Sequence, residues 1–463
     1  MQKLRSPSLL LLFCCCLSGS QANRVYVHPF YLFAADNVSC ETLQTQTSKS
    51  LETLPVATLD NEVQTPDSRD PSDQDGLRQN ITQRTAVLAG LSDALGLRMY
   101  QALSSAQSSI NTLLSPVNTF GSLITFYMGA SKKTARSYQL LLGLNRHTDG
   151  ADCVSLVDGH KVLRTLQSIN SLVDDGPKDE IDTQVWAFAP QDARLSEDFI
   201  KGTQDFSDTS FIRGVDFSRP QKAEVLLNTF VEKTSEGRVK RLFSDLSSST
   251  NLLFISSISF KGNWKTAFQP EKTTLQAFHV DEATIVMVPM MTHTGQYQYF
   301  NDKKLQCTVV KLALSKRSYM LLVVPHEGAS LDDIGAKLNI DVISDWHRDL
   351  KEGLLELSLP KFSMSSVNEL HDLLTKIDPE VETELLGSRA EFDRLTTTKP
   401  FTVDKVFNKV LFEMSEEGSE TQNTSPDAGV PLKLSINRPF FFSVTEGNSN
   451  AILLLGRVSN PAL

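Results

Sequence analysis

The sequence of 463 residues lacks the short motifs that mark most catalytic and metal-binding sites. It contains no G-x-S-x-G, H-E-x-x-H or P-loop motif, and no C-x-x-C or H-x-x-x-H spacing that would suit a zinc ion. The stretch from His347 to Lys351 resembles a kinase catalytic loop, but Leu354 stands where the metal-binding Asn is required. We therefore expect a protein that is not an enzyme and that holds no cofactor and no metal.

Long apolar runs and an excess of basic residues are also missing. No stretch after the first residues reaches the roughly 18 to 20 continuous apolar residues of a membrane span. The chain carries 45 Lys and Arg against 55 Asp and Glu, so its net charge of −10 repels nucleic acid and anionic lipid. With 40% hydrophobic residues, the chain can nevertheless bury a large core. These properties predict a globular protein without a nucleic-acid or membrane partner.

The first 22 residues have the pattern of a secretory signal peptide. Lys3 and Arg5 precede a short apolar run at 9–17, and Ser20 and Ala22 are small residues at the expected cleavage site. A membrane anchor is the alternative, but the apolar run is too short for it. We expect cleavage after Ala22 and a mature chain that is secreted and extracellular.

Cysteine is scarce, because three of the six cysteines lie in the signal peptide. Cys40, Cys153 and Cys307 remain, so at most one disulfide forms within the chain and one thiol stays free. Three N-x-S/T sequons predict surface glycosylation of a secreted protein. Their asparagines are Asn37, Asn80 and Asn423.

Composition divides the mature chain into a tail and a folded body. Thr, Gln, Ser, Asp and Pro dominate from Glu41 to about Asn80, and a flexible acidic tail is therefore expected over residues 33–84. The body is expected over residues 85–463. It contains apolar stripes at helical spacing over 87–103 and 223–231, and another helix is expected from Leu370 behind a capping box that begins at Ser366.

Strands are as evident as helices in the body. Apolar runs of strand length occur at 252–260 and 319–324, and residues 354–359 alternate between apolar and polar. Two further apolar runs, 438–444 and 451–458, flank a turn-rich joint and predict a hairpin. Because strands mix in after the first helices without regular βαβ alternation, the pattern predicts an α+β fold.

Six segments of the body resemble the serpin family in the same order along the chain. They are residues 113–144, 215–243, 251–268, 355–364, 405–418 and 437–461. The first contains a Ser-Pro helix start and a Gly-Ala turn, the second opens with Val-Asp-Phe, and the third contains Phe-Lys-Gly-x-Trp. The resemblance covers the chain from about residue 85 to its end. It implies a serpin fold, with a large central β-sheet, further sheets and helices, and an exposed reactive-centre loop.

The loop that serpins use for inhibition departs from the family pattern. A serpin inhibitor inserts its cut loop as a new strand into the large sheet. The resemblance assigns the hinge of this loop to Glu416, Glu417, Gly418 and Ser419. Small residues should follow, but Gln422, Asn423 and Pro426 oppose burial as a strand. Inhibition of a serine protease through the loop after Gly418 is therefore the less favoured alternative, and a carrier of hydrophobic ligands is a third.

A second resemblance lies directly after the signal peptide. Residues 23–32, NRVYVHPFYL, resemble a vasoactive decapeptide hormone that certain non-inhibitory serpins carry at the front of the mature chain. The similarity implies that a renin-like aspartic protease cleaves the Leu32–Phe33 bond, with Phe30 and Tyr31 in its upstream pockets. We expect this segment to be extended and unanchored, which suits an enzyme that binds extended peptides through main-chain hydrogen bonds.

The same resemblance implies further processing. A dipeptidyl carboxypeptidase would remove Tyr31 and Leu32 and then stop, because its next step would have to cut the His28–Pro29 bond. The remaining octapeptide would act on a cell-surface receptor and regulate blood pressure and salt and fluid balance. Its residues are Asn23, Arg24, Val25, Tyr26, Val27, His28, Pro29 and Phe30.

The resemblance finally implies a disulfide between Cys40 and Cys153 that ties the tail to the body. Reduction of this bond is expected to change the rate of decapeptide release without unfolding the body. In the alternative, Cys40 is free and Cys153 is buried or paired with Cys307.

Overall fold

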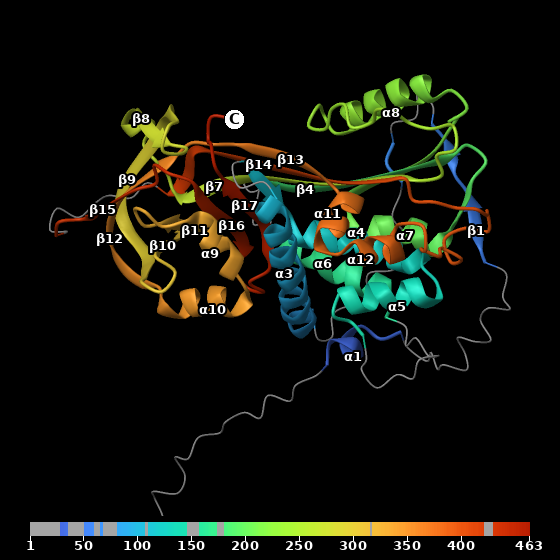
Figure 1. Cartoon of the computed structure of the whole chain (residues 1–463), viewed down its shortest axis with the longest axis horizontal. Coiled ribbons are helices and arrows are strands. Elements are labelled where there is room, and N and C mark those ends of the chain that lie inside the picture. Colours follow the sequence, from blue (N-terminus) through green and yellow to red (C-terminus); the bar gives the residue numbers. More distant parts are fainter. Residues whose placement is uncertain are drawn as a thin grey trace, which may run out of the picture.

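The computed structural model describes residues 28–35, 51–59, 65–67, 81–106, 110–145, 157–173, 180–314, 317–420 and 429–463. Within these residues, two large β-sheets and a group of helices make up the body (Figure 1). The helices are α1 (Pro29–Phe33), α3 (Ile81–Ala106), α4 (Pro116–Gly129), α5 (Lys132–Leu141), α6 (Gly159–Val173), α7 (Glu197–Phe206), α8 (Pro220–Thr234), α9 (Leu331–Lys337), α10 (Ile340–Asp349), α11 (Leu370–Ile377), α12 (Pro379–Leu385) and the 3-10 helix η2 (Pro270–Lys272).

The helices begin where local sequence signals favour them. At the start of α4, the side chain of Ser115 accepts a hydrogen bond from the backbone of Asn118 over 3.2 Å, and Pro116 takes the first helical position. The two predicted apolar stripes are confirmed, because they lie within α3 and α8. Helix α3 starts at Ile81, before the expected boundary of the body at residue 85.

The six-stranded sheet holds the long strands of the body. In order across the sheet, its strands are β13 (Met364–Glu369), β14 (Lys405–Glu420), β7 (Leu253–Thr266), β4 (Glu180–Pro190), β6 (Thr209–Val215) and β2 (Ala57–Thr58). Helix α8 covers one face of this sheet, and α4 and α6 lie on the other side (Figure 1). Successive side chains of β7 point to opposite faces of the sheet. Leu253 and Ile255 therefore join the apolar cluster under α8, while Phe254 joins the main core on the other face.

The nine-stranded sheet contains the C-terminal hairpin. Its strands are β15 (Leu432–Ser435), β12 (Lys351–Pro360), β9 (Ile285–Asp302), β10 (Cys307–Ala313), β11 (Ser318–Pro325), β16 (Phe440–Glu446), β17 (Ile452–Val458) and β3 (Thr112–Leu114), with β8 (Thr274–His279) paired to β9. The antiparallel pairing of β16 with β17 confirms the predicted hairpin. The strands predicted at 252–260, 319–324 and 354–359 are also confirmed, as β7, β11 and β12.

The capping box predicted at Ser366 is wrong in its position. Residues 364–369 form β13, which pairs with β14, and α11 is capped by Glu369, whose side chain accepts a hydrogen bond from the backbone of Asp372 over 3.0 Å. The Ser366 hydroxyl instead donates to the carbonyl oxygen of Leu113 over 2.5 Å. Pairing within the sheet outweighs the local capping preference here.

Part of the predicted flexible tail is folded onto the body. Strand β1 (Thr53–Pro55) pairs antiparallel with β5 (Arg194–Ser196), and β2 pairs parallel with β6 at the edge of the six-stranded sheet. Val56 and Leu59 are buried beside these strands. The prediction of a flexible tail over 33–84 is therefore wrong for this part, because backbone pairing and apolar burial hold it on a sheet edge that would otherwise be open.

Candidate functional site

The described part of the predicted hormone segment is a short helix. In α1, Pro29 takes the first helical position, and Nδ1 of His28 accepts a hydrogen bond from the backbone of Phe30 over 3.2 Å. The prediction of an extended, unanchored segment is therefore wrong for these residues. Residues 23–27 lie outside the part that the structure describes.

Burial of its apolar side chains holds α1 on the body. Phe30 is 6% exposed, Leu32 9% and Phe33 0%, whereas Tyr31 is 59% exposed. These buried side chains belong to the main core. Burial of side chains of this size stabilises a folded state by about 1.5 to 3 kcal/mol each. The predicted scissile bond, Leu32–Phe33, therefore joins two buried residues, and the arrangement leaves mainly Tyr31 for an approaching enzyme.

Backbone hydrogen bonds fix the residues that follow the predicted scissile bond. The backbone N–H of Asp158 donates to the carbonyl oxygen of Phe33 over 2.7 Å, and Ala34 forms an antiparallel β-bridge with Val157. Lys161 Nζ donates to the carbonyl oxygen of Ala34 over 3.1 Å. Residues 157–161, at the start of α6, thus form the docking edge for this segment.

A partly buried ionic cluster lies next to the docking edge, between α6 and α7. His160 Nδ1 is 2.7 Å from Asp205 Oδ2, and Arg164 Nε donates to Asp205 Oδ1 over 3.0 Å. Asp198 lies 3.9 Å from the other ring nitrogen of His160. Burial alone would lower the pKa of His160, but the carboxylates of Asp198 and Asp205 outweigh burial and raise it to about 9. The imidazole is therefore charged at neutral pH.

A second anchor holds the tail on the edge of the six-stranded sheet. Arg213 on β6, with only 3% of its side chain exposed, donates to Asp67 Oδ1 over 2.5 Å and to the carbonyl oxygen of Thr65 over 2.7 Å. The other oxygen of Asp67 accepts the backbone N–H of Ile212 over 2.8 Å, and the backbone N–H of Asp67 donates to Ser210. The tail therefore supplies the counter-charge for a buried guanidinium.

The predicted hinge of the reactive loop forms the last part of β14. Strand β14 runs parallel to β7, from Lys405 opposite Leu253 to Glu420 opposite Thr266, with an irregularity before Gly418. Glycine is required at this position, because a Cβ would lie 2.4 Å from the backbone nitrogen of Ala267.

Side-chain bonds tie the start of the hinge to neighbouring elements. Lys361 Nζ donates to Glu416 Oε2 over 2.7 Å, and the backbone N–H of Phe268 donates to the Glu416 carbonyl oxygen over 3.0 Å. Ser419 donates through its hydroxyl to the carbonyl oxygen of Lys265 over 3.1 Å. Glu417 lies among these residues in an exposed position. A strand inserted between β7 and β14 would have to break this ladder and these contacts.

Several predicted sites lie outside the described residues. They are Asn37, Asn80, Asn423, Cys40 and Cys153. Cys307, by contrast, is a free and buried thiol on β10, and burial raises its pKa to about 12. The alternative in which Cys153 pairs with Cys307 is therefore wrong.

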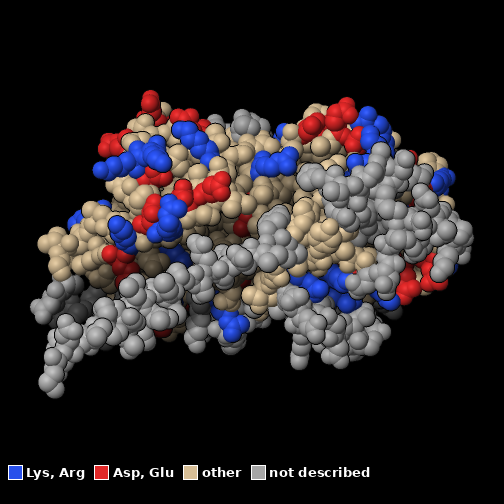
Figure 2. All heavy atoms as spheres, turned by 90° about the horizontal axis from the view of Figure 1, so that it is seen from below, with Lys and Arg blue, Asp and Glu red and all other residues tan. Residues whose placement is uncertain are grey.

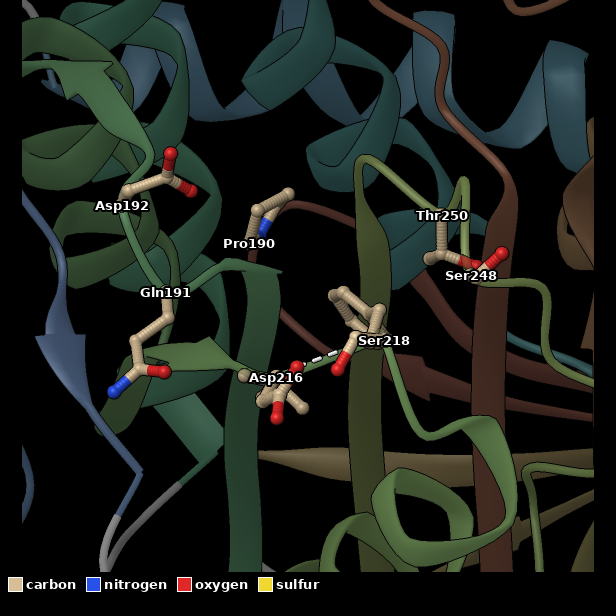
Figure 3. Close-up of a pocket in the computed structure, with 9 residues that line it drawn as sticks. Pro190, Gln191, Asp192, Asp216, Ser218, Ser248 and Thr250 are labelled. Atoms are coloured by element: carbon tan, nitrogen blue, oxygen red, sulfur yellow. Dashed lines mark hydrogen bonds between the residues drawn. The ribbon is translucent and has the colours of Figure 1, made fainter.

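A surface cavity of about 400 Å³ lies at the ends of β4 and β6 (Figure 3). Its lining includes Asp192, Asp216, Ser218, Ser248 and Thr250, and the backbone of Ser218 donates to Asp216 Oδ1 over 3.0 Å. A carrier of hydrophobic ligands needs a largely apolar pocket. Pro190, Val215 and Phe217 lie beside these polar residues, so the lining is mixed and is not the largely apolar pocket that such a carrier needs.

Lys and Arg side chains are intermixed with Asp and Glu on the face seen from below, the side on which α1 lies (Figures 1 and 2). The described helices include none with the length and apolar character needed to cross a membrane. In the described part of the chain, no group of three or more His, Cys, Asp or Glu side chains is placed to hold a metal ion.

The two large sheets and the helices around them define a known class. The family model for serpins, serine protease inhibitors, matches residues 91–461, and the chain belongs to the serpin family. Serpins are not enzymes.

Among curated proteins, the chain is similar to the angiotensinogen of Rattus norvegicus, with 30% identity over 96% of this chain and 95% of the relative. The angiotensinogen of Bos taurus is 30% identical over 95% of this chain and 94% of the relative. Serpin A3-7 of Bos taurus is 29% identical over 81% of this chain and 88% of the relative.

Solved structures show the same fold. Mouse protein-Z dependent protease inhibitor has a TM-score of 0.73 at 23% identity and covers 83% of this chain and 100% of its own. Human thyroxine-binding globulin in complex with thyroxine has a TM-score of 0.70 at 25% identity, with coverage of 81% and 99%. The predicted α+β serpin fold is thus confirmed.

Sequence reasoning missed the residues that receive the predicted hormone segment. Asp158 and Lys161 contribute through a backbone amide and a long side chain, neither of which leaves a pattern in the sequence. The helix itself had one local signal, Pro29, because proline is favoured at the first position of a helix.

Proposed function

We propose that this serpin is a secreted precursor of an angiotensin-like peptide hormone. Residues 1–22 are removed as a signal peptide, and a renin-like aspartic protease then cleaves Leu32–Phe33 to release the decapeptide 23–32. A dipeptidyl carboxypeptidase trims it to the octapeptide 23–30, which acts on a cell-surface receptor to regulate blood pressure and salt and fluid balance. The mature chain, glycosylated at its sequons, carries the peptide.

Two observations together support this proposal. The peptide motif is intact, and the alignment with angiotensinogen extends in front of the serpin body. The alignment with rat angiotensinogen covers 96% of the chain, whereas that with Serpin A3-7 covers 81%. The longer alignment includes part of the chain in front of the serpin match at residues 91–461, where NRVYVHPFYL stands at residues 23–32.

Release requires that α1 first leave the body. An aspartic protease binds its substrate as an extended strand through main-chain hydrogen bonds, and a helix cannot offer those groups. Unwinding also exposes Leu32 and Phe33, at about 1.5 to 3 kcal/mol for each side chain. Apolar pockets of the protease on either side of the bond offset this cost. The body therefore sets the fraction of molecules in which the Leu32–Phe33 bond is extended and accessible to the protease.

The inhibitory alternative has less support. Loop insertion would have to open the ladder between β7 and β14, and the residues that follow the hinge include Gln422 and Pro426. Pro426 has no N–H to donate to a new ladder, and a sugar on Asn423 would not fit between strands.

One pair of variants tests the assignment of the scissile bond. An acidic side chain is not accepted by an apolar protease pocket, so Leu32→Asp should abolish release of a decapeptide by a renin-like protease. The matched control is Leu54→Asp, at an exposed tail leucine in β1, which should be cut like the wild type. Release from Leu32→Asp at the wild-type rate would remove the assignment.

A further inference from the structure

The phenol of Tyr127 forms hydrogen bonds with Val157, the first residue of the docking edge for α1. Tyr127 lies on α4 and is 2% exposed. Its Oη accepts the backbone N–H of Val157 over 2.9 Å and donates to the carbonyl oxygen of the same residue over 3.1 Å. Gln139 Nε2 on α5 donates to the same Oη over 3.1 Å. One hydroxyl thus satisfies both backbone groups of Val157 and is itself oriented by a buried amide.

Val157 is the residue that pairs with the segment after the scissile bond. It forms the β-bridge with Ala34, and the next residue, Asp158, donates its backbone N–H to Phe33. Tyr127 therefore holds the backbone against which Phe33 and Ala34 dock.

We propose that Tyr127 is a positioning residue for peptide release: through Val157, it sets the fraction of molecules in which the Leu32–Phe33 bond is free for the protease. This inference rests on the proposed function. Loss of the hydroxyl leaves the N–H and C=O of Val157 and the Gln139 amide without this partner in a buried site, which destabilises the docking edge. The undocked population then rises, while the bond itself is unchanged.

A shift of this kind has a specific kinetic signature. A protease that binds only the undocked segment has an apparent KM raised by the docked fraction, whereas its kcat for the bound segment is independent of docking. Tyr127→Phe should therefore lower the KM for release by about three- to tenfold, the range expected from one buried hydrogen-bonding group, with kcat unchanged.

Tyr138→Phe is the matched control. Tyr138 on α5 is equally buried, and its hydroxyl donates to the carbonyl oxygen of Leu385 over 2.9 Å, away from the docking edge. The Tyr138→Phe substitution also removes a buried phenol oxygen, so it should lower the melting temperature of the protein without lowering the KM for release. Gln139→Met, which removes the amide that orients Tyr127, should lower KM in the same direction but by less, and it serves if Tyr127→Phe does not fold.

A second readout does not depend on the protease. Hydrogen exchange of peptides that contain Asp158, measured by mass spectrometry on the full chain, should be about three- to tenfold faster in Tyr127→Phe and unchanged in Tyr138→Phe. Equal KM values and equal exchange in Tyr127→Phe and Tyr138→Phe would overturn the inference.

The synthetic peptide of residues 23–36 separates this outcome from a failure of the proposed function. If neither the peptide nor the wild-type chain is cut at Leu32–Phe33, the proposed function is wrong. If both are cut and Tyr127→Phe behaves like Tyr138→Phe, only the role of Tyr127 is wrong.

Discussion

The carbonyl oxygen of Phe33 accepts a hydrogen bond of 2.7 Å from the backbone nitrogen of Asp158, the residue directly before helix α6. Asp158 also accepts the backbone N–H of Lys161 through Oδ1 over 3.1 Å, so the residue whose side chain orders the start of α6 also receives the proposed hormone segment through its backbone. Peptide and body are thereby coupled through the backbone. Anything that disturbs the start of α6 should change the exposure of the scissile bond.

Removal of the tail carboxylate at Asp67 should destabilise the body. Asp67→Asn leaves the buried guanidinium of Arg213 without its counter-charge, and we expect the free energy of unfolding to fall by about 2 to 3 kcal/mol, given that Asp67 is partly exposed. Urea denaturation at neutral pH measures this loss. The matched control is Glu356→Gln, which breaks an exposed ion pair with Lys433 and should cost less than about 0.5 kcal/mol. Equal losses would show that the tail anchor is not structural.

Stability should fall with rising pH because of His160. Its pKa of about 9 in the folded protein lies above the usual 6.5, so the folded state holds a proton that the unfolded state loses first. The contribution is fully present below pH 6.5 and is lost as the pH rises through about 9; it amounts to at most about 3 kcal/mol. Chemical denaturation from pH 6 to about 10 should show this decline in the wild type and a smaller one in His160→Gln. The same decline in both proteins would contradict the assignment.

Cutting the loop after Gly418 should not convert the protein to a more stable form. An inhibitory serpin gains stability when the cut loop enters the sheet, but here Gln422 and Pro426 oppose burial of the loop as a strand. The melting temperature before and after limited proteolysis tests this, together with a search for detergent-resistant complexes with serine proteases. A trapped covalent complex would favour the inhibitory function.

Loss of the proposed disulfide between Cys40 and Cys153 should change the rate of decapeptide release without unfolding the body. A tail tied to the body by the disulfide holds the proposed scissile bond in one position and conformation. Without the disulfide, the tail would adopt many. Release from the wild type is compared with that from a Cys40→Ala, Cys153→Ala double variant, and Cys307→Ala is the control at a free, buried thiol. Equal rates, or peptide mapping that finds Cys40 unpaired, would contradict this prediction.

The sequence was sufficient where structure depends on local pattern. The strand at 319–324 and the C-terminal hairpin were predicted because dense apolar runs next to turn residues are local signals. The pairing of Ala57–Thr58 with β6 was not, since two residues carry no period, and the ion pair between Asp67 and Arg213 joins positions that only the fold brings together.

The conformation expected for the proposed hormone segment was wrong in its described residues. Five residues are too few for a helical period, so the extended form that suits a protease was expected for PFYLF, whereas burial of Phe30, Leu32 and Phe33 favours the helix. Tertiary packing decides the conformation of so short a segment.

Mass spectrometry of the secreted chain after digestion with a renin-like protease tests the central claim most directly. The account predicts a small product with the mass of residues 23–32 and a large fragment that begins at Phe33. A digest in which the chain is cut elsewhere, or in which the Leu32–Phe33 bond remains intact while a control substrate is consumed, would contradict it.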